Sequence, residues 1–216
     1  VVDIGGLFIK EGPIVQVRST GSDREILRDR DQTVEWDGPL VILVNEFSAS
    51  ASEILAAAVQ DYKRAIIIGS AQTYGKGTVQ NIIDLNRMVR NNTNGDMGAL
   101  KFTTQKYYRI NGGSTQLEGV KSDVIVPNRY TYVDMGERDQ DNPLPWDEIE
   151  PATYELWKSS IDYETTIERS RKRMAQSPEM KLIDENAKWI KKVRSKKLYS
   201  LKYQIYEANL KRREEE

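Results

Sequence analysis

The residues best suited to chemistry are three serines among small side chains and one lysine between two glycines. Ser48, Ser50 and Ser52 lie in the segment EFSASASEIL, and Lys76 lies in TYGKGTVQ. A serine hydroxyl becomes a good nucleophile when a nearby base takes its proton. The 216 residues include no histidine and no cysteine, which excludes a Ser-His-Asp triad, a Cys-His pair and a His-ligated zinc within the chain. Any base must therefore be Lys, Asp, Glu or Tyr.

Ser50 is predicted to lie where a strand gives way to a helix. Residues 39–45 (PLVILVN) are continuously apolar and β-branched, which predicts a buried strand, and the segment from Ser50 to Tyr62 has helical spacing. A serine at such a junction lies beside the free N–H groups of the helix, of which Ala51 N–H is the candidate for stabilising an oxyanion. Ser50 and Glu53 also fit a capping box, which requires no catalysis. Both interpretations remain open on these residues alone.

Lys76 is a candidate general base. Burial away from water disfavours the charged form of a lysine, and the flanking strands and Tyr74 could supply a buried site. Gln80, four residues further on, could hydrogen-bond the amine and orient it. A solvent-exposed turn is the simple alternative. A phosphate loop is disfavoured, because five residues instead of four separate Gly69 from Gly75 and Gly77 stands where Ser or Thr is required.

The remaining pattern predicts an α/β (α+β) fold: a βαβ-containing sheet core covered by helices, followed by a mainly helical C-terminal region. A long alternating segment leads into the turn NGGS. The predicted strands are residues 12–18, 39–45, 65–69, 78–85, 102–110 and 123–126, and the predicted helix of the core is 50–62. The segment between the first two strands is expected to be a loop or an exposed hairpin.

Composition changes around residue 128. Residues 129–150 are polar and marked by prolines, which predicts a linker, and residues 151–216 are highly charged and mainly helix-forming. At the end of the chain the spacing fits either a helix or a strand. The chain begins inside an apolar segment with no initiator Met, so we expect residues 1–128 to be part of a larger core. The formal net charge of -1 gives no electrostatic bias toward nucleic acid, and we expect no such partner despite the basic segment KKVRSKK.

Several of these motifs occur together in one known family. The run GPLVILVNEFSASASEILAAAVQDYKRAIIIG, then TYGKGTVQ, then KFTTQKYYRINGGSTQLEGVKSDVIVP, closely resembles the carboxyl-terminal processing peptidases, or tail-specific proteases. NPLPWDEI and the charged helical region resemble the C-terminal extension of the periplasmic subgroup. The resemblance covers most of the chain and implies a crotonase-like core.

Position by position, the resemblance implies roles for four residues. Ser50 matches the nucleophile, Lys76 the general base, Gln80 the residue that orients the lysine, and Ala51 an oxyanion donor through its backbone N–H. It implies cleavage near the C-termini of unfolded or tagged proteins without a metal or cofactor. It also implies a periplasmic or cell-envelope location and an upstream PDZ domain that captures C-terminal peptides. The C-terminal region could bind an adaptor or mediate self-association.

Some features depart from the family pattern. No PDZ-like segment and no glycine-rich oxyanion loop is present, and Gly5 and Gly6 lie too close to the following strand to match that loop. The loop from Gly69 to Gly75 is one residue longer than usual, and Ser122 replaces a common proline. The fragment could therefore be inactive alone. The alternative function is a catalytically inactive module that binds peptides by strand addition.

Overall fold

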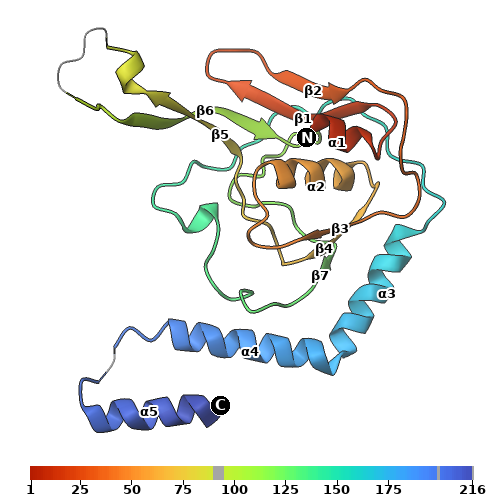
Figure 1. Cartoon of the computed structure of the whole chain (residues 1–216). Helices are drawn as coiled ribbons and strands as arrows, with labels where there is room; N and C mark the ends of the chain where they lie inside the picture. Colours follow the sequence, from red (N-terminus) through yellow and green to blue (C-terminus); the bar gives the residue numbers. More distant parts are fainter. Residues whose placement is uncertain (90–94, 199, 216) are drawn as a thin grey trace.

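A computed structural model describes residues 1–89, 95–198 and 200–215 of the chain (Figure 1). The helices are α1 (Val2–Gly6), α2 (Ala51–Asp61), α3 (Tyr163–Gln176), α4 (Pro178–Arg194) and α5 (Tyr203–Glu215), with two short 3-10 helices, η1 (Leu85–Arg87) and η2 (Glu137–Asp139). The strands are β1 (Gly12–Ser19), β2 (Glu25–Asp29), β3 (Val41–Val44), β4 (Ile66–Gly69), β5 (Thr78–Asp84), β6 (Ala99–Tyr108) and β7 (Val124–Ile125).

The strands form two sheets of different kinds. One sheet is antiparallel with the order β2-β1-β6-β5, and the other is parallel with the order β3-β4-β7. β3, α2 and β4 form the predicted βαβ unit, with Val41 opposite Ile66 and Val44 opposite Gly69. The predicted α/β core with a helical C-terminal region is thus confirmed. β2 pairs with β1, so the polar segment after β1 is an exposed hairpin.

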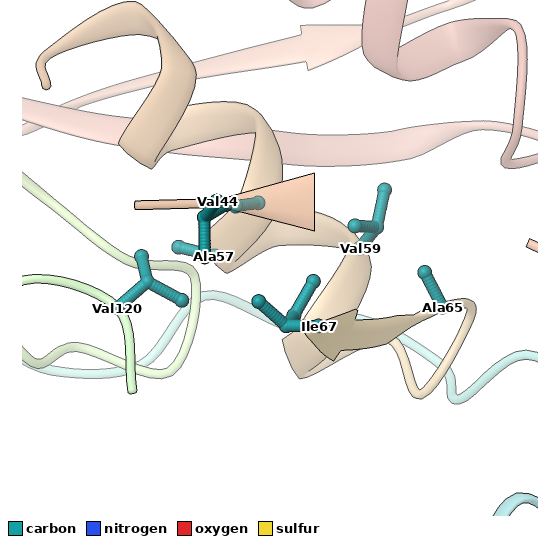
Figure 2. Packing of buried hydrophobic residues seen from close by; sticks show 7 residues of the cluster. Val44, Ala57, Val59, Ala65, Ile67 and Val120 are labelled. Atoms are coloured by element: carbon teal, nitrogen blue, oxygen red, sulfur yellow. The ribbon is translucent and has the colours of Figure 1, made fainter. Parts of the chain in front are cut away.

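Helix α2 lies at the centre of the hydrophobic core, and two of its faces are buried. One face packs on the parallel sheet (Figure 2) in a cluster of Val44, Ala56, Ala57, Val59, Ala65, Ile67 and Val120. The other face packs toward β1 in a cluster of Ile9, Ile14, Ala58, Tyr62 and Ile110. Small alanines dominate α2, which lets both layers approach it closely. This packing fixes the position of the N-terminal end of α2, where Ser50 lies.

The expectation that residues 39–45 form a fully buried strand is wrong for part of β3. Leu43 is 78% exposed and Val41 is 48% exposed, whereas Ile42 and Val44 pack against the cluster under α2. The physical reason is that side chains alternate along a strand and α2 covers one face of this sheet. β3 is also the edge strand of its sheet.

Residues 129–162 follow an irregular path with only η2 as a helical turn, and hydrogen bonds tie much of this segment to the core. Trp146 donates to the Ser114 carbonyl at 2.9 Å, and Ala152 N–H donates to the Ile110 carbonyl at 2.8 Å. Regular helix begins at Tyr163, where the Asp162 side chain caps α3. The last segment, for which helix and strand were both open, is helical in α5. No helix in the described ranges combines the length and apolar character needed to cross a bilayer.

An ion pair at the C-terminal end of α2 joins the helix to the segment after β6. Arg109 binds the carboxylate of Asp61 through two nitrogens, at 2.5 and 3.1 Å, and the Asp61 side chain is only 5% exposed. Asn111 donates to the same carboxylate at 3.0 Å. Burial raises the pKa of Asp61, and the Arg109 guanidinium opposes that rise. Asp61 therefore joins the C-terminal end of α2 to the segment after β6.

We predict that Asp61→Ala lowers the free energy of unfolding by about 3–5 kcal/mol, because it leaves a largely buried guanidinium unpaired. Urea unfolding of the purified protein measures this effect. Glu118→Ala serves as the control, since it breaks an exposed ion pair with Lys121 and is expected to cost no more than about 1 kcal/mol. Equal effects of the two variants would contradict the structural role assigned to Asp61.

Candidate active site

Ser50 has an unusual backbone conformation at the junction between the 45–50 loop and α2. Its φ is 57° and its ψ is -113°, a combination that costs a non-glycine residue about 1–3 kcal/mol. Such strain is retained where the surrounding structure imposes it, and it concentrates at functional sites. Ser50 also forms a capping box with Glu53, so the residue caps the helix while its side chain remains half-buried at the helix N-terminus.

The carboxylate of Glu53 links the Ser50 junction to the Lys76 loop. Glu53 is fully buried, at 0% exposure. It accepts hydrogen bonds from Ser50 N–H at 2.8 Å, Thr73 Oγ1 at 2.5 Å, Gly75 N–H at 2.7 Å and Lys76 N–H at 3.0 Å. We call these four bonds the Glu53 network. Through it, two segments separated by more than 20 residues share one carboxylate.

The electrostatics of Glu53 reflect two opposed effects. Burial raises the pKa of its carboxyl group, and the hydrogen bonds from Thr73, Gly75, Ser50 and Lys76 oppose that rise. A buried carboxylate is costly unless donors satisfy its lone pairs. Here three backbone N–H groups and one hydroxyl do so, and the cost of burial is offset only while both segments keep this geometry.

The glycines around Lys76 make room for another backbone segment. A Cβ at Gly75, where φ is 89°, would lie 2.9 Å from the Leu117 carbonyl carbon, and a Cβ at Gly77 would lie 2.6 Å from Gln116 N. Gly77 N–H donates to the Gln116 side chain at 2.9 Å, and Leu117 N–H donates to the Gly75 carbonyl at 2.8 Å. The glycines thus permit close packing of the 114–117 segment, which fixes the backbone path of Lys76.

The side chains of the other predicted site residues lie as follows. Lys76 is half-buried, and within the described part of the chain its ammonium group has no hydrogen bond or ion pair. Gln80 lies on β5 opposite Thr103, after an irregularity in the pairing, and is exposed. No contact between Gln80 and Lys76 occurs among the hydrogen bonds of the described residues, so its orienting role stays a prediction. Ala51 is the first residue of α2, and its N–H has no acceptor within the helix.

Gly5 and Gly6 allow close packing of α1 and do not form a glycine-rich loop. They lie in α1, and added Cβ atoms would meet the side chains of Ile14 at 2.7 Å and Asp29 at 2.4 Å. This agrees with the expectation that they do not replace the family's glycine-rich loop. Among the described residues there is no group of three or more carboxylates or other ligand side chains placed to hold a metal ion.

Sequence reasoning missed two residues beside Lys76. The hydroxyl groups of Tyr107 and Thr115 both donate to the Lys76 carbonyl, the second at 3.0 Å. Tyr107 was assigned only to an alternating strand, and its inward position in that alternation was the available signal. Glu53 lies on the buried side of a helix rich in alanine. A carboxylate at such a position needs hydrogen-bond partners from elsewhere in the chain, and this was the signal available in the sequence.

One curated relative matches nearly all of this chain and a second matches more than half of it. It is 42% identical over 212 residues to the "Tail-specific protease" of Haemophilus influenzae, an alignment that covers 96% of this chain and 30% of that protein. It is 38% identical over 141 residues to the "Carboxy-terminal-processing protease" of Bartonella bacilliformis, covering 62% of this chain and 30% of the relative. The chain thus spans about 30% of the length of these relatives.

Two family models match the chain. Residues 130–216 match the C-terminal domain of tail specific protease (DUF3340). The solved "Photosystem II D1 C-terminal processing protease" is 31% identical, with a TM-score of 0.49, over 57% of this chain and 30% of that one. Residues 1–126 match the model of Peptidase family S41, and the chain belongs to that family.

Proposed function

We propose that this chain forms the catalytic core of a serine peptidase in which Ser50 is the nucleophile and Lys76 the general base. The Glu53 network carries the proposal, because it holds the backbone of both residues on one buried carboxylate. The strained backbone of Ser50 and the free N–H of Ala51 add to it. Membership of Peptidase family S41 supports the reaction class.

The proposed reaction proceeds through an acyl-enzyme. Neutral Lys76 takes the proton of the Ser50 hydroxyl while Oγ attacks the substrate carbonyl carbon. Ala51 N–H stabilises the oxyanion, and the Lys76 ammonium then gives its proton to the leaving amine. Water hydrolyses the ester by the reverse sequence of proton transfers. Gln80 is proposed to orient the Lys76 amine, as the family pattern suggests.

The substrates are proposed to be unfolded or tagged proteins cleaved near their C-termini. Support comes from the names of the relatives, which describe tail-specific and carboxy-terminal-processing proteases. A PDZ domain elsewhere in the full-length protein would capture the C-terminal peptide, and a periplasmic or cell-envelope location would follow the same pattern. The C-terminal helices are proposed to serve assembly or adaptor binding.

We predict that Ser50→Ala and Lys76→Ala each lower cleavage of an unstructured C-terminally tagged reporter by roughly 10⁴-fold or more in the full-length protein, because a nucleophile and its base act as one unit. Ser52→Ala is the matched control, since Ser52 is exposed in the same run and is expected to keep full activity. If Ser50→Ala still cleaved the reporter, the assignment would be wrong. If the unaltered protein bound the reporter without cutting it, the peptide-binding alternative would hold.

We predict that Glu53→Gln lowers cleavage by about 10- to 100-fold and the free energy of unfolding by about 1–3 kcal/mol, because an amide nitrogen cannot accept the N–H bonds that the carboxylate accepts. Steady-state cleavage and urea unfolding measure the two effects. Glu46→Gln is the control: Glu46 is also buried, but its carboxylate contacts Asn128 at 2.9 Å and not the Lys76 loop. Unchanged activity in Glu53→Gln would remove the main support for the proposal.

A further inference from the structure

A segment of the C-terminal region packs against the loop that carries Lys76. Residues 136–144 lie within the range that matches the C-terminal domain model, whereas Lys76 lies within the range that matches the peptidase model. Glu137 N–H donates to the Tyr74 carbonyl at 2.9 Å, and a Cβ at Gly136 would lie 2.9 Å from the same oxygen. The two parts of the chain are therefore in direct backbone contact two residues before the proposed base.

Gln116 makes a second link between these parts, on the other side of Lys76. Its side chain is fully buried, at 0% exposure. The side-chain oxygen accepts the Gly77 N–H at 2.9 Å. The side-chain nitrogen donates to the Leu144 carbonyl at 3.0 Å and to the Glu137 carboxylate at 3.4 Å. One amide group thus joins the residue directly after the proposed base to the C-terminal region.

The partners of Gln116 require both an acceptor and a donor at this position. A backbone N–H can only donate, and a carbonyl or carboxylate oxygen can only accept. Glutamine supplies both ends, whereas an ionised glutamate has no proton for the Leu144 carbonyl and would face the Glu137 carboxylate. The backbone of Gln116 is also held, since its N–H donates to Ser114 Oγ at 3.0 Å. The amide therefore reaches both parts of the chain from a fixed point.

We infer that Gln116 is a positioning residue for the peptidase reaction, because it holds the loop of Lys76 against the 136–144 segment of the C-terminal region. This role rests on the proposed function of Lys76. The Glu53 network binds the Lys76 N–H from the side of α2, and Gln116 binds the next N–H, that of Gly77, from the side of the C-terminal region. Loss of the second anchor would let the backbone of the base move, and a displacement of about 1 Å can cost roughly 100-fold in rate.

Three variants separate the two ends of the Gln116 amide. Gln116→Met keeps the length of the side chain and removes both hydrogen-bonding ends. Gln116→Glu keeps an acceptor for Gly77 N–H and removes the donor toward the C-terminal region. Adding Glu137→Gln to Gln116→Glu returns a donor to the 3.4 Å contact with the roles of the two residues exchanged.

Gln16→Met is the matched control. Gln16 is also a fully buried glutamine, at 0% exposure. Its side-chain nitrogen donates to two backbone carbonyls at 3.0 and 3.2 Å, and both carbonyls lie outside the Lys76 loop. This variant therefore has the same chemical change and the same kind of buried loss without a bond to the backbone of the base.

The test uses the full-length protein and a serine-directed fluorophosphonate, which measures the reactivity of Ser50, together with kcat and KM for the tagged reporter. Assays at pH 9 keep the introduced carboxyl group ionised. Gln116→Met and Gln116→Glu are each expected to lower the labelling rate and kcat by about 10- to 100-fold with KM unchanged. The double variant is expected to recover to within about threefold of the unaltered protein. Gln16→Met is expected to label at the unaltered rate, whatever its unfolding midpoint in urea.

Four results would overturn the inference. Labelling of Gln116→Met at the unaltered rate would show that Gln116 does not position the base. Full activity of Gln116→Glu, or no recovery in the double variant, would show that the C-terminal region does not act through this amide. A fall in rate matched by Gln16→Met, or a rise in KM in place of a fall in kcat, would show a purely structural role. Absence of Ser50 labelling in the unaltered protein, with Ser50→Ala as the reference, would instead refute the proposed function itself.

Discussion

The structure depends on one buried carboxylate that two distant segments must satisfy. Glu53 lies on the inward side of α2 at 0% exposure, and among the described residues no lysine or arginine side chain hydrogen-bonds its oxygens. Its charge is tolerated because Ser50, Thr73, Gly75 and Lys76 all point donors at it. These donors come from the loop before α2 and from the loop before β5. Desolvation therefore makes the backbones of Ser50 and Lys76, which follow the parallel strands β3 and β4, converge on one carboxylate.

The two sheets and α2 hold the Ser50 junction and the Lys76 loop in place. Packing of α2 on both faces fixes where the helix begins, and the ion pair between Asp61 and Arg109 holds its other end. The antiparallel sheet fixes β5 and β6, and with them the loop that carries Lys76. The strained Ser50 backbone is the local cost of this arrangement, and the Glu53 network is what offsets it.

Much of this could be predicted from local patterns. The strand–helix junction at Ser50, the βαβ order and the Gly-Lys-Gly loop all follow from periodicity and turn chemistry over short windows. The long-range partners could not. Glu53 fits a capping box in the sequence, and it does bond to Ser50, but its bonds to the Lys76 loop depend on how α2 packs. The same holds for the exposure of Leu43, since a strand's apolar run does not reveal which face a helix will cover.

The proposed reaction requires a serine and a lysine to act without histidine. In the proposed reaction the lysine must lie near Ser50 Oγ and be poorly solvated, and the Glu53 network holds the backbones of both residues on one carboxylate. The most direct measurement is a crystal structure of the full-length protein with a fluorophosphonate bound. The account predicts phosphorus bonded to Ser50 Oγ, a phosphoryl oxygen at Ala51 N–H, and Lys76 Nζ within about 3.2 Å of Oγ. An adduct on another residue, or a Lys76 amine turned to solvent with the Glu53 network intact, would contradict it.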